Sequence, residues 1–351
     1  MSGSDTNLRQ LLRSIALLLA IGAMVVALLA AVPSLSVVTR ELGHAQGGWV
    51  VLAVVAELAS CFAFVVFFQG IFWRGPRRLA ARLAWTEMAA GALLPAGGAG
   101  GLGTGALVLR KLGMPGRAIA VRSSVVFLLT SAVTVGALSL FGFGLAVGVF
   151  AGPHEPLLTL FPAVVGVLVI GLFLAVPGPL TRIAEKHADS HSRIASTLTS
   201  LAAGIRESKA VLCHPDWRLL GAVGFWIFDV VTLWLAFRAL GSAPAFGAVA
   251  MGYLIGMVAN IIPIPGGIGV VDLGLVGMLA VYAAPLSAAA AAVLIYRAIS
   301  LWTPTLIGTV AYVLLRGDLR RPITPRRGFW PPPEQAFAHA SSITATKERL
   351  P

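Results

Sequence analysis

Five ionisable side chains lie in segments that are otherwise apolar: Glu57, Glu87, Asp229, Asp272 and Arg297. A charged side chain at the centre of a membrane helix costs roughly 2.5–3.5 kcal/mol on insertion scales, so such residues are usually paired and functional. Arg297 is the deep cation of the set, and its planar guanidinium suits the paired oxygens of a phosphate or a carboxylate. We therefore expect either an oxyanion site at Arg297 or an ion pair with Asp229 or Asp272 that only fixes helix packing.

A proline- and glycine-rich stretch from Asn260 to Asp272 separates two apolar runs, each about half as long as a membrane crossing. Prolines remove backbone donors and prevent a continuous helix, and glycines then allow a sharp turn. The residues of this break are Asn260, Pro263, Pro265, Gly266, Gly267 and Gly269. In transporters such breaks mark binding sites, because the following half-helix points its positive amino end at an anion. Asp272 lies in the first turn of that half-helix, where it either complements the helix dipole or takes part in the site.

A similar break lies earlier in the chain, in the segment 83–109, and contains Pro95, Gly97 and Gly98. Basic residues flank this segment on both sides, so both of its ends are expected to face the cytoplasm. It is then re-entrant, entering the membrane partway and returning. The later broken segment, about 246–284, is expected to enter from the outer side. Two broken segments that enter from opposite sides indicate an inverted repeat that meets near the midplane.

The composition is that of a polytopic membrane protein. Hydrophobic residues make up 58% of the 351, charged residues 11%, and the mean hydropathy is +0.89, against roughly 45–50% apolar and 25% charged in soluble domains. The net charge of +12 does not indicate nucleic-acid binding, because the basic residues cluster between apolar runs as the positive-inside rule requires. We predict an all-α fold with two re-entrant segments and about six spanning helices: 15–32, 49–72, 123–145, 157–176, 219–240 and 286–315.

The chain is expected to consist of one transmembrane domain with a cytoplasmic linker inside it and a cytoplasmic tail at each end. Residues 1–14 form a basic cytoplasmic tail, and residues 15–315 form the transmembrane domain. Within that domain, 180–218 reads as an amphipathic cytoplasmic linker. Residues 316–351, which include Pro331–Pro333, are expected to be a disordered cytoplasmic tail. This organisation predicts a multi-pass protein of the bacterial plasma membrane with both termini in the cytoplasm.

Other chemical motifs find little support. His187 and His191 are spaced to share a helix face, but no matching carboxylate or cysteine pattern completes a metal site. The run Gly98–Gly103 matches G-x-G-x-x-G, yet a dinucleotide site needs a strand and a βαβ unit around it. No nucleophile triad, P-loop or zinc signature is present. We expect no catalytic residues, metal or cofactor, and a transporter-like protein rather than an enzyme.

Three stretches resemble the lysylphosphatidylglycerol synthase transmembrane (flippase-like) family. The strongest is Pro263-Ile-Pro265-Gly-Gly-Ile-Gly-Val-Val-Asp272, similar to the family's P-x-P-G-G-x-G pattern followed by hydrophobic residues and an acid. The second is the apolar run from Ala290 to Trp302, with Tyr296 and Arg297 at the family's Tyr-Arg positions. The third is the break at Leu94–Gly98, which leads to Arg110. The similarity covers about residues 15–315.

This resemblance implies translocation or binding of lipid by a membrane domain that works without the family's separate aminoacyltransferase domain. The substrate would be an anionic or aminoacyl-modified phospholipid, or another lipid-linked molecule. Arg297, with Tyr296 beside it, and the amides after Pro265 would contact the phosphate, while Glu57, Glu87 and Asp229 would contact a cationic headgroup or pair with Arg297.

Two other functions stay open. The chain could be a membrane-embedded transferase, or its accessory subunit, acting on polyprenyl-linked sugar, with Glu87 as the candidate acid or base. It could also be a membrane scaffold whose basic face and tail recruit a membrane or cytoplasmic partner protein. The sequence leaves the oligomeric state undefined.

Overall fold

The structure is a computed structural model that describes residues 43, 45–72, 77–93, 98–175, 203–209, 211, 216–242, 244–258, 269–282 and 284–320. The chain divides into two units, Met1–Ala45 and Gln46–Pro351, and the helices from Gly47 onward belong to the second. The expected first span, both proline–glycine breaks (94–97 and 259–268), most of the linker and the tail after residue 320 lie outside the described residues.

Every regular element among the described residues is a helix, which confirms the all-α prediction. The helices are α3 (Gly47–Phe72), α4 (Arg77–Leu93), α5 (Gly98–Lys111), α6 (Gly116–Ala146), α7 (Pro156–Ala175), the 3₁₀ turn η1 (Trp217–Leu219), α10 (Leu220–Ala239), α11 (Phe246–Gly256), α12 (Val270–Tyr282) and α13 (Leu286–Arg320).

Five described helices are long and apolar enough to cross a membrane, and the chain is a multi-pass membrane protein. These helices are Gly47–Phe72, Gly116–Ala146, Pro156–Phe173, Trp217–Ala239 and Leu286–Leu319. They coincide with the five predicted spans that fall in the described part of the chain. Each predicted break separates two short helices, α4 from α5 and α11 from α12. With 11 and 13 residues, neither α11 nor α12 reaches the roughly 20 residues that a crossing needs.

Some predicted boundaries were wrong, because charged residues were taken as ends of helices. The third span was expected to begin at residue 123, yet α6 begins at Gly116, directly after Pro115, and carries Arg117 and Arg122 in its first turns. Likewise, α4 begins at Arg77 within the basic segment. Arginine has a good helix propensity, so a helix continues through it into the headgroup region.

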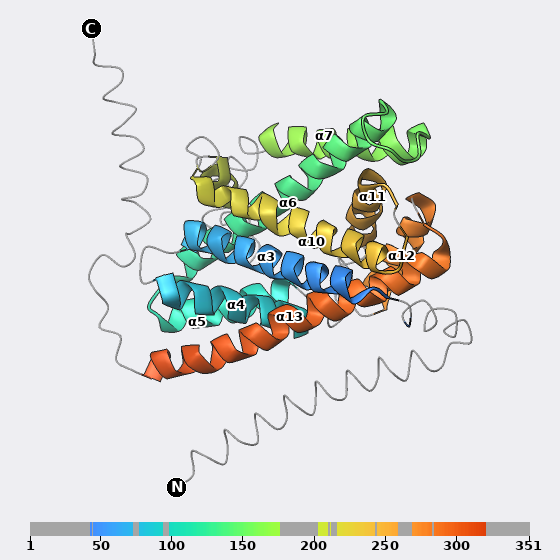
Figure 1. The fold of residues 1–351 in the computed structure, drawn as a ribbon. Coiled ribbons are helices and arrows are strands. Elements are labelled where there is room, and N and C mark those ends of the chain that lie inside the picture. The colour runs from blue at the N-terminus through green and yellow to red at the C-terminus, as the bar shows by residue number, and fades with distance from the viewer. Residues whose placement is uncertain are drawn as a thin grey trace. The chain divides into compact units, whose positions relative to one another are not determined.

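Helices α3 and α10 run antiparallel and side by side (Figure 1). The amide of Gln46 donates to the carbonyl of Ala239 at 2.8 Å, and the Ser60 hydroxyl donates to the carbonyl of Phe225 at 2.8 Å. A Cβ on Gly221 would lie 2.9 Å from the nitrogen and 3.0 Å from the Cβ of Phe67. Since lipid is as apolar as leucine, such close contact through small residues is what holds membrane helices together.

The contacts within the set α3–α6 match those within the set α10–α13. In the first set α3 contacts α4 and α5 contacts α6; in the second set α10 contacts α11 and α12 contacts α13. Across the two sets, α4 packs on α13, and α6 packs on α11. This pattern is what an inverted repeat built from α3–α6 and α10–α13 produces. The direction in which each set enters the membrane stays a prediction.

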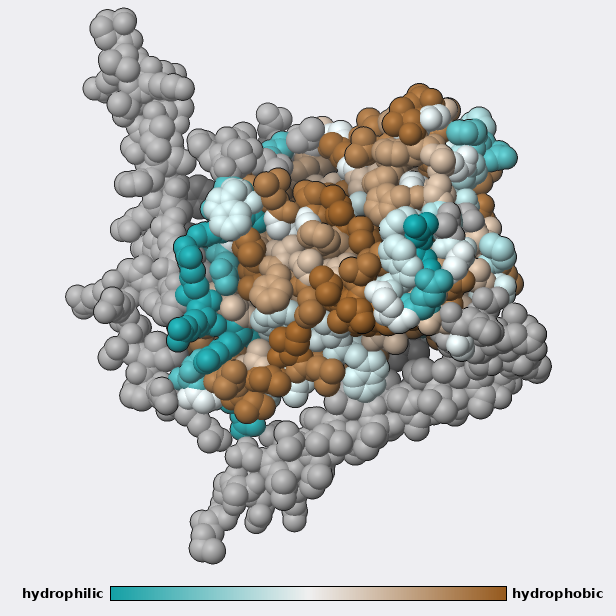
Figure 2. All heavy atoms as spheres, viewed as in Figure 1, coloured by the Kyte–Doolittle hydropathy of each residue, from teal (hydrophilic) through white to brown (hydrophobic). Residues whose placement is uncertain are grey.

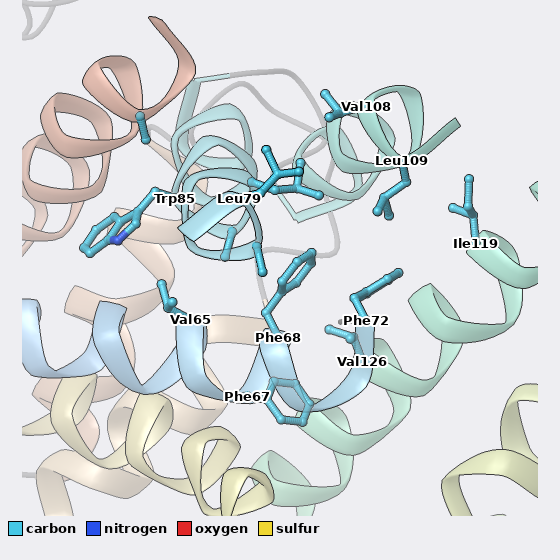
Figure 3. Packing of buried hydrophobic residues seen from close by; sticks show 14 of the residues in the cluster. Val65, Phe67, Phe68, Phe72, Leu79, Trp85, Val108, Leu109, Ile119 and Val126 are labelled. Atoms are coloured by element: carbon cyan, nitrogen blue, oxygen red, sulfur yellow. The ribbon is translucent and has the colours of Figure 1, made fainter. Parts of the chain in front are cut away.

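An aromatic and aliphatic core fills the space between α3, α4, α5 and α6 (Figure 3). Phe67, Phe68 and Phe72 are fully buried on α3, and the rings of Phe68 and Phe72 stack with centroids 4.6 Å apart. Leu109 of α5 and Leu83 of α4 close the same cluster. This core therefore joins the first broken segment to the spanning helices on both sides of it.

The surface of the protein is apolar over a broad band as well. Figure 2 shows hydrophobic residues across the middle of one face and hydrophilic residues at two opposite edges of it. On α7, exposed apolar side chains include Leu157, Phe161, Leu168 and Leu172. Arg238 lies over the rings of Trp49 and Trp234, with its guanidinium 5.1 Å from each centroid. An apolar belt with Arg and Trp at its border is typical of a membrane-spanning surface.

A short part of the predicted linker is described, and it packs on α6. Residues 203–209 are helical, Gly204 faces Ser124 of α6, and Arg206 is exposed. Burial raises the pKa of the Glu207 carboxyl above its usual range, and the Arg122 guanidinium opposes that shift. In this part the side chains of Ile205 and Ser208 are buried and that of Arg206 is exposed; the amphipathic character of the whole linker stays a prediction.

The predicted orientation can be tested by cysteine labelling. In a background with Cys61 and Cys213 replaced by alanine, Ser242→Cys, between α10 and α11, should react with a membrane-impermeant maleimide in intact cells. Arg117→Cys should react only after permeabilisation, because its basic flank is expected inside. The reverse pattern would contradict the predicted orientation of both broken segments.

The α3–α10 contact makes a second prediction. Gly221→Val should lower the unfolding free energy by about 1–3 kcal/mol, because the added side chain meets the backbone of α3. Gly171→Val is the matched control, since no atom lies within 4 Å of a Cβ at Gly171 of α7. Denaturant titration of the detergent-solubilised proteins measures the unfolding free energy of each variant. Equal losses in the two variants would show that helix propensity, not packing, is responsible.

Candidate functional site

A polar cluster lies where α3, α10, α11, α12 and α13 meet, and it gathers most of the predicted residues that the structure describes. Glu57 comes from the middle of α3 and Asp229 from the middle of α10, while Asp272 opens α12 and α13 supplies Tyr296 and Arg297. The antiparallel pairing of α3 with α10 places the first two carboxyls at the same depth. We call these residues, together with Tyr253 of α11, the polar cluster.

Asp229 accepts hydrogen bonds from two phenols. The Tyr253 hydroxyl donates to Oδ2 of Asp229, and the Tyr296 oxygen lies 3.0 Å from Oδ2 and 3.1 Å from Oδ1. Both tyrosines are buried, and their rings meet edge to face with centroids 6.1 Å apart. Two O–H donors stabilise the ionised form of the carboxylate. Asp229 is therefore fixed in place by two different helices.

Glu57 is held more loosely although it is only 5% exposed. The Cys61 thiol, one turn further along α3, donates to Oε1 of Glu57 at 3.8 Å. Its other carboxyl oxygen, Oε2, has no hydrogen-bond partner among the described residues. The carboxyl interacts electrostatically with that of Asp229 across the α3–α10 contact. Two carboxyls thus meet inside the protein.

Arg297 forms an ion pair with Asp272, 2.5 Å from Nε to Oδ1. The other oxygen of Asp272, Oδ2, accepts the amide hydrogen of Gly269 at 2.9 Å. Gly269 has a φ of +88° and precedes α12 directly, so Asp272 closes the amino end of this helix in the manner of a capping box. Asp272 therefore complements the end of the helix, and of the two candidate acids it is the one that pairs with Arg297; its part in a binding site stays a prediction.

The ion pair is partly open to the surface. The Arg297 side chain is 22% exposed and that of Asp272 is 30% exposed. Arg297 also acts electrostatically on Asp229, which connects the ion pair to the carboxyl pair. An oxyanion can therefore approach the guanidinium at the amino end of α12, where the helix dipole also favours negative charge.

The remaining predicted residues lie elsewhere. Glu87, 5% exposed on α4, faces α5, where its carboxyl contacts the backbone at Gly105. Gly101 lies against the Glu87 backbone as well, so these glycines allow α4 and α5 to approach closely. Gly98 begins α5. Outside the described residues lie Pro95, Gly97, Asn260, Pro263, Pro265, Gly266 and Gly267.

Sequence reasoning missed Tyr253. This residue is one of only four tyrosines in the chain, and it lies in an apolar run with no ionisable neighbour to draw attention to it. A phenol inside a membrane segment needs a hydrogen-bond partner when buried. Tyr253 could therefore have been predicted as a hydrogen-bond donor to one of the carboxyls expected at a similar depth in the membrane.

These features define a polytopic helical membrane protein with two pairs of short helices, one of which, α11 and α12, supplies Tyr253 and Asp272 to the polar cluster. The chain belongs to the family described as the lysylphosphatidylglycerol synthase TM region, whose sequence pattern matches residues 15–308. This confirms the resemblance found in the sequence.

Among curated proteins, the chain is similar to UPF0104 membrane proteins of archaea. It is 30% identical to one from Methanocaldococcus jannaschii over 95 residues, 27% of this chain and 28% of that protein. A second, from Methanothermobacter thermautotrophicus, is 28% identical over 95 residues, with the same coverage of 27% and 28%. Another protein of that organism is 33% identical over 93 residues, 26% of each chain. Each match therefore spans little more than a quarter of the relative's length.

The energetic role of the Arg297–Asp272 pair is open to a double-mutant cycle. Asp272→Asn, Arg297→Gln and the double variant should give a coupling energy of about 1–2 kcal/mol in denaturant titrations, since the pair is short but partly exposed. The control cycle uses Asp216 and Arg218, which are 3.9 Å apart with side chains 49% and 29% exposed, and should give about 0.5 kcal/mol or less. Additive effects at residues 272 and 297 would contradict a role of this ion pair in stability.

Proposed function

We propose that the protein moves an anionic or aminoacyl-modified phospholipid, or another lipid-linked molecule, between the two leaflets of a bacterial plasma membrane. One observation carries the proposal: the Arg297 guanidinium is held by Asp272 at the amino end of α12. Membership in a family described by a lipid-modifying synthase supports the choice of a lipid as substrate.

The chemistry of that site suits a phosphate diester. A lipid phosphate can replace the Asp272 carboxylate on Arg297, because both are oxyanions and both accept charge-assisted hydrogen bonds from a guanidinium. After the exchange the Asp272 carboxylate keeps the hydrogen bond from the Gly269 amide and the positive end of the α12 dipole. An arginine already neutralised by a neighbour also avoids the expense of a lone cation in the membrane when no lipid is bound.

The helices beside the site have the lengths expected of a broken segment. Helices α11 and α12, with 11 and 13 residues, are each too short to span the membrane, and such interrupted segments are where transporters bind their substrates. In this proposal both termini are cytoplasmic and a membrane lipid is the ligand. Glu87, the candidate acid or base of a transferase, is packed against α5, which favours a role in packing.

Headgroup translocation in proteoliposomes tests this proposal across several labelled phospholipids. Wild type should flip at least one of them, and Arg297→Ala should reduce the rate by about tenfold or more, the factor for 1.4 kcal/mol of lost binding to the moving headgroup. Arg297→Lys should also be impaired, because it keeps the charge but loses the planar fork. Arg117→Ala, an exposed arginine of α6, is the control and should flip at the wild-type rate.

The outcomes separate clearly. Full activity of Arg297→Lys would argue against direct phosphate contact, and full activity of Arg297→Ala would remove Arg297 from the path. Wild type that flips no lipid, while product forms from a labelled lipid-linked sugar donor, would replace this proposal with the transferase.

A further inference from the structure

The polar cluster holds more acids than bases. Glu57, Asp229 and Asp272 face one cation, Arg297, and Arg297 is already paired with Asp272. The cluster's two tyrosines, Tyr253 and Tyr296, and the Cys61 thiol of α3, the other titratable group that faces it among the described residues, are neutral in their ordinary state. With every carboxyl ionised, the cluster would carry two uncompensated negative charges inside the membrane.

Two like charges in contact in a medium of low polarity do not both ionise. One proton on the Glu57–Asp229 pair removes half of the excess and turns a repulsion into a hydrogen bond. Two carboxyls that interact in this way take up and release protons as a pair.

The hydrogen bonds decide which carboxyl carries the proton. Asp229 receives two phenol O–H groups, an arrangement that suits a carboxylate. On Glu57, Oε1 accepts the Cys61 thiol, as the carbonyl oxygen of an acid would, and Oε2 has no partner among the described residues. A proton on Oε2 makes this oxygen a donor toward the Asp229 carboxylate and satisfies the one buried carboxyl oxygen that the described part of the chain leaves unpaired.

A second buried group points to the same place. The indole N–H of Trp226, one helical turn before Asp229 on α10, also has no partner among the described residues. Its ring lies edge to face with that of Tyr253, 6.4 Å between centroids. The surroundings of Asp229 therefore offer both an unpaired donor and an unpaired acceptor, in a membrane interior where unpaired polar groups are rare.

We propose that Glu57 and Asp229 form a proton-binding site, with the proton on Oε2 of Glu57, and that its release to water drives lipid translocation. In the loaded state the O–H of Glu57 is donated to Asp229. On release the O–H bond breaks, the proton leaves to water and two carboxylates remain. Their repulsion loosens the α3–α10 contact, and the added negative charge competes with Asp272 for Arg297. The coupling to translocation rests on the function proposed above, whereas the proton site does not.

Infrared spectroscopy tests the site without any transport assay. At neutral pH the difference spectrum between wild type and Glu57→Gln should show the carbonyl stretch of a protonated carboxylic acid, because the contribution of the other buried acid, Glu87, cancels in the difference. Glu155→Gln, which changes an exposed glutamate next to α7, is the matched control and should keep the band. If Glu57→Gln does not fold, Cys61→Ala replaces it: the acid remains, but loss of the thiol donor should shift the band. A wild-type spectrum without the band, or a band unchanged in Glu57→Gln or in Cys61→Ala, would overturn the site.

Proteoliposomes with a pH gradient test the coupling. Wild type and Glu155→Gln should flip lipid several-fold faster with the gradient than without it, and Glu57→Gln should flip at one rate under both conditions. A wild-type rate that ignores the gradient, or that follows sodium at fixed pH instead, would overturn the coupling even if the infrared band is present. Absence of any flipping in wild type would count against the proposed lipid transport, while the infrared result would still decide on the proton site.

Discussion

The burial of charge in a medium that cannot solvate it is the constraint on which this structure depends. Ionisable groups of the polar cluster are matched to partners on other helices: Arg297 with Asp272, Asp229 with Tyr253 and Tyr296. Because these partners come from different elements, the helices can pack in only one arrangement that satisfies them all. The polar contacts thus specify the packing that hydrophobic residues alone, equally stable in lipid, would leave undefined.

The α3–α10 pair places this cluster at the centre of the fold. Close contact through Gly221 and Ser60 allows the two helices to run antiparallel over most of their length, and this brings Glu57 beside Asp229. The broken segments then pack on either side, with α4 against α13 and α6 against α11. The two matching halves thus bring Glu57 of one half and Asp229 of the other together in one polar site.

Much of this could be predicted from the sequence. Apolar length indicated the spans, proline and glycine indicated the two broken segments, and the cost of intramembrane charge selected Glu57, Asp229, Asp272 and Arg297 before their contacts were known. The choice of partner could not be predicted, because Arg297 had two candidate acids and only the fold decides between them. Tyr253 escaped because a tyrosine in an apolar run carries no charge to indicate its role. Glu87 was grouped with the others although it packs against α5. A position inside an apolar segment does not tell which neighbouring helix the side chain will face.

Helix α13 is one continuous helix from Leu286 to Arg320 with Pro304 inside it. Arg297 lies on one side of Pro304, and Asp318, which pairs with Arg82 of α4, lies on the other, about 32 Å away along a straight helix. A proline inside a helix removes one backbone hydrogen bond and permits a bend at that point. Pro304 therefore permits α13 to bend between the part that carries Arg297 and the part that Asp318 ties to Arg82 of α4.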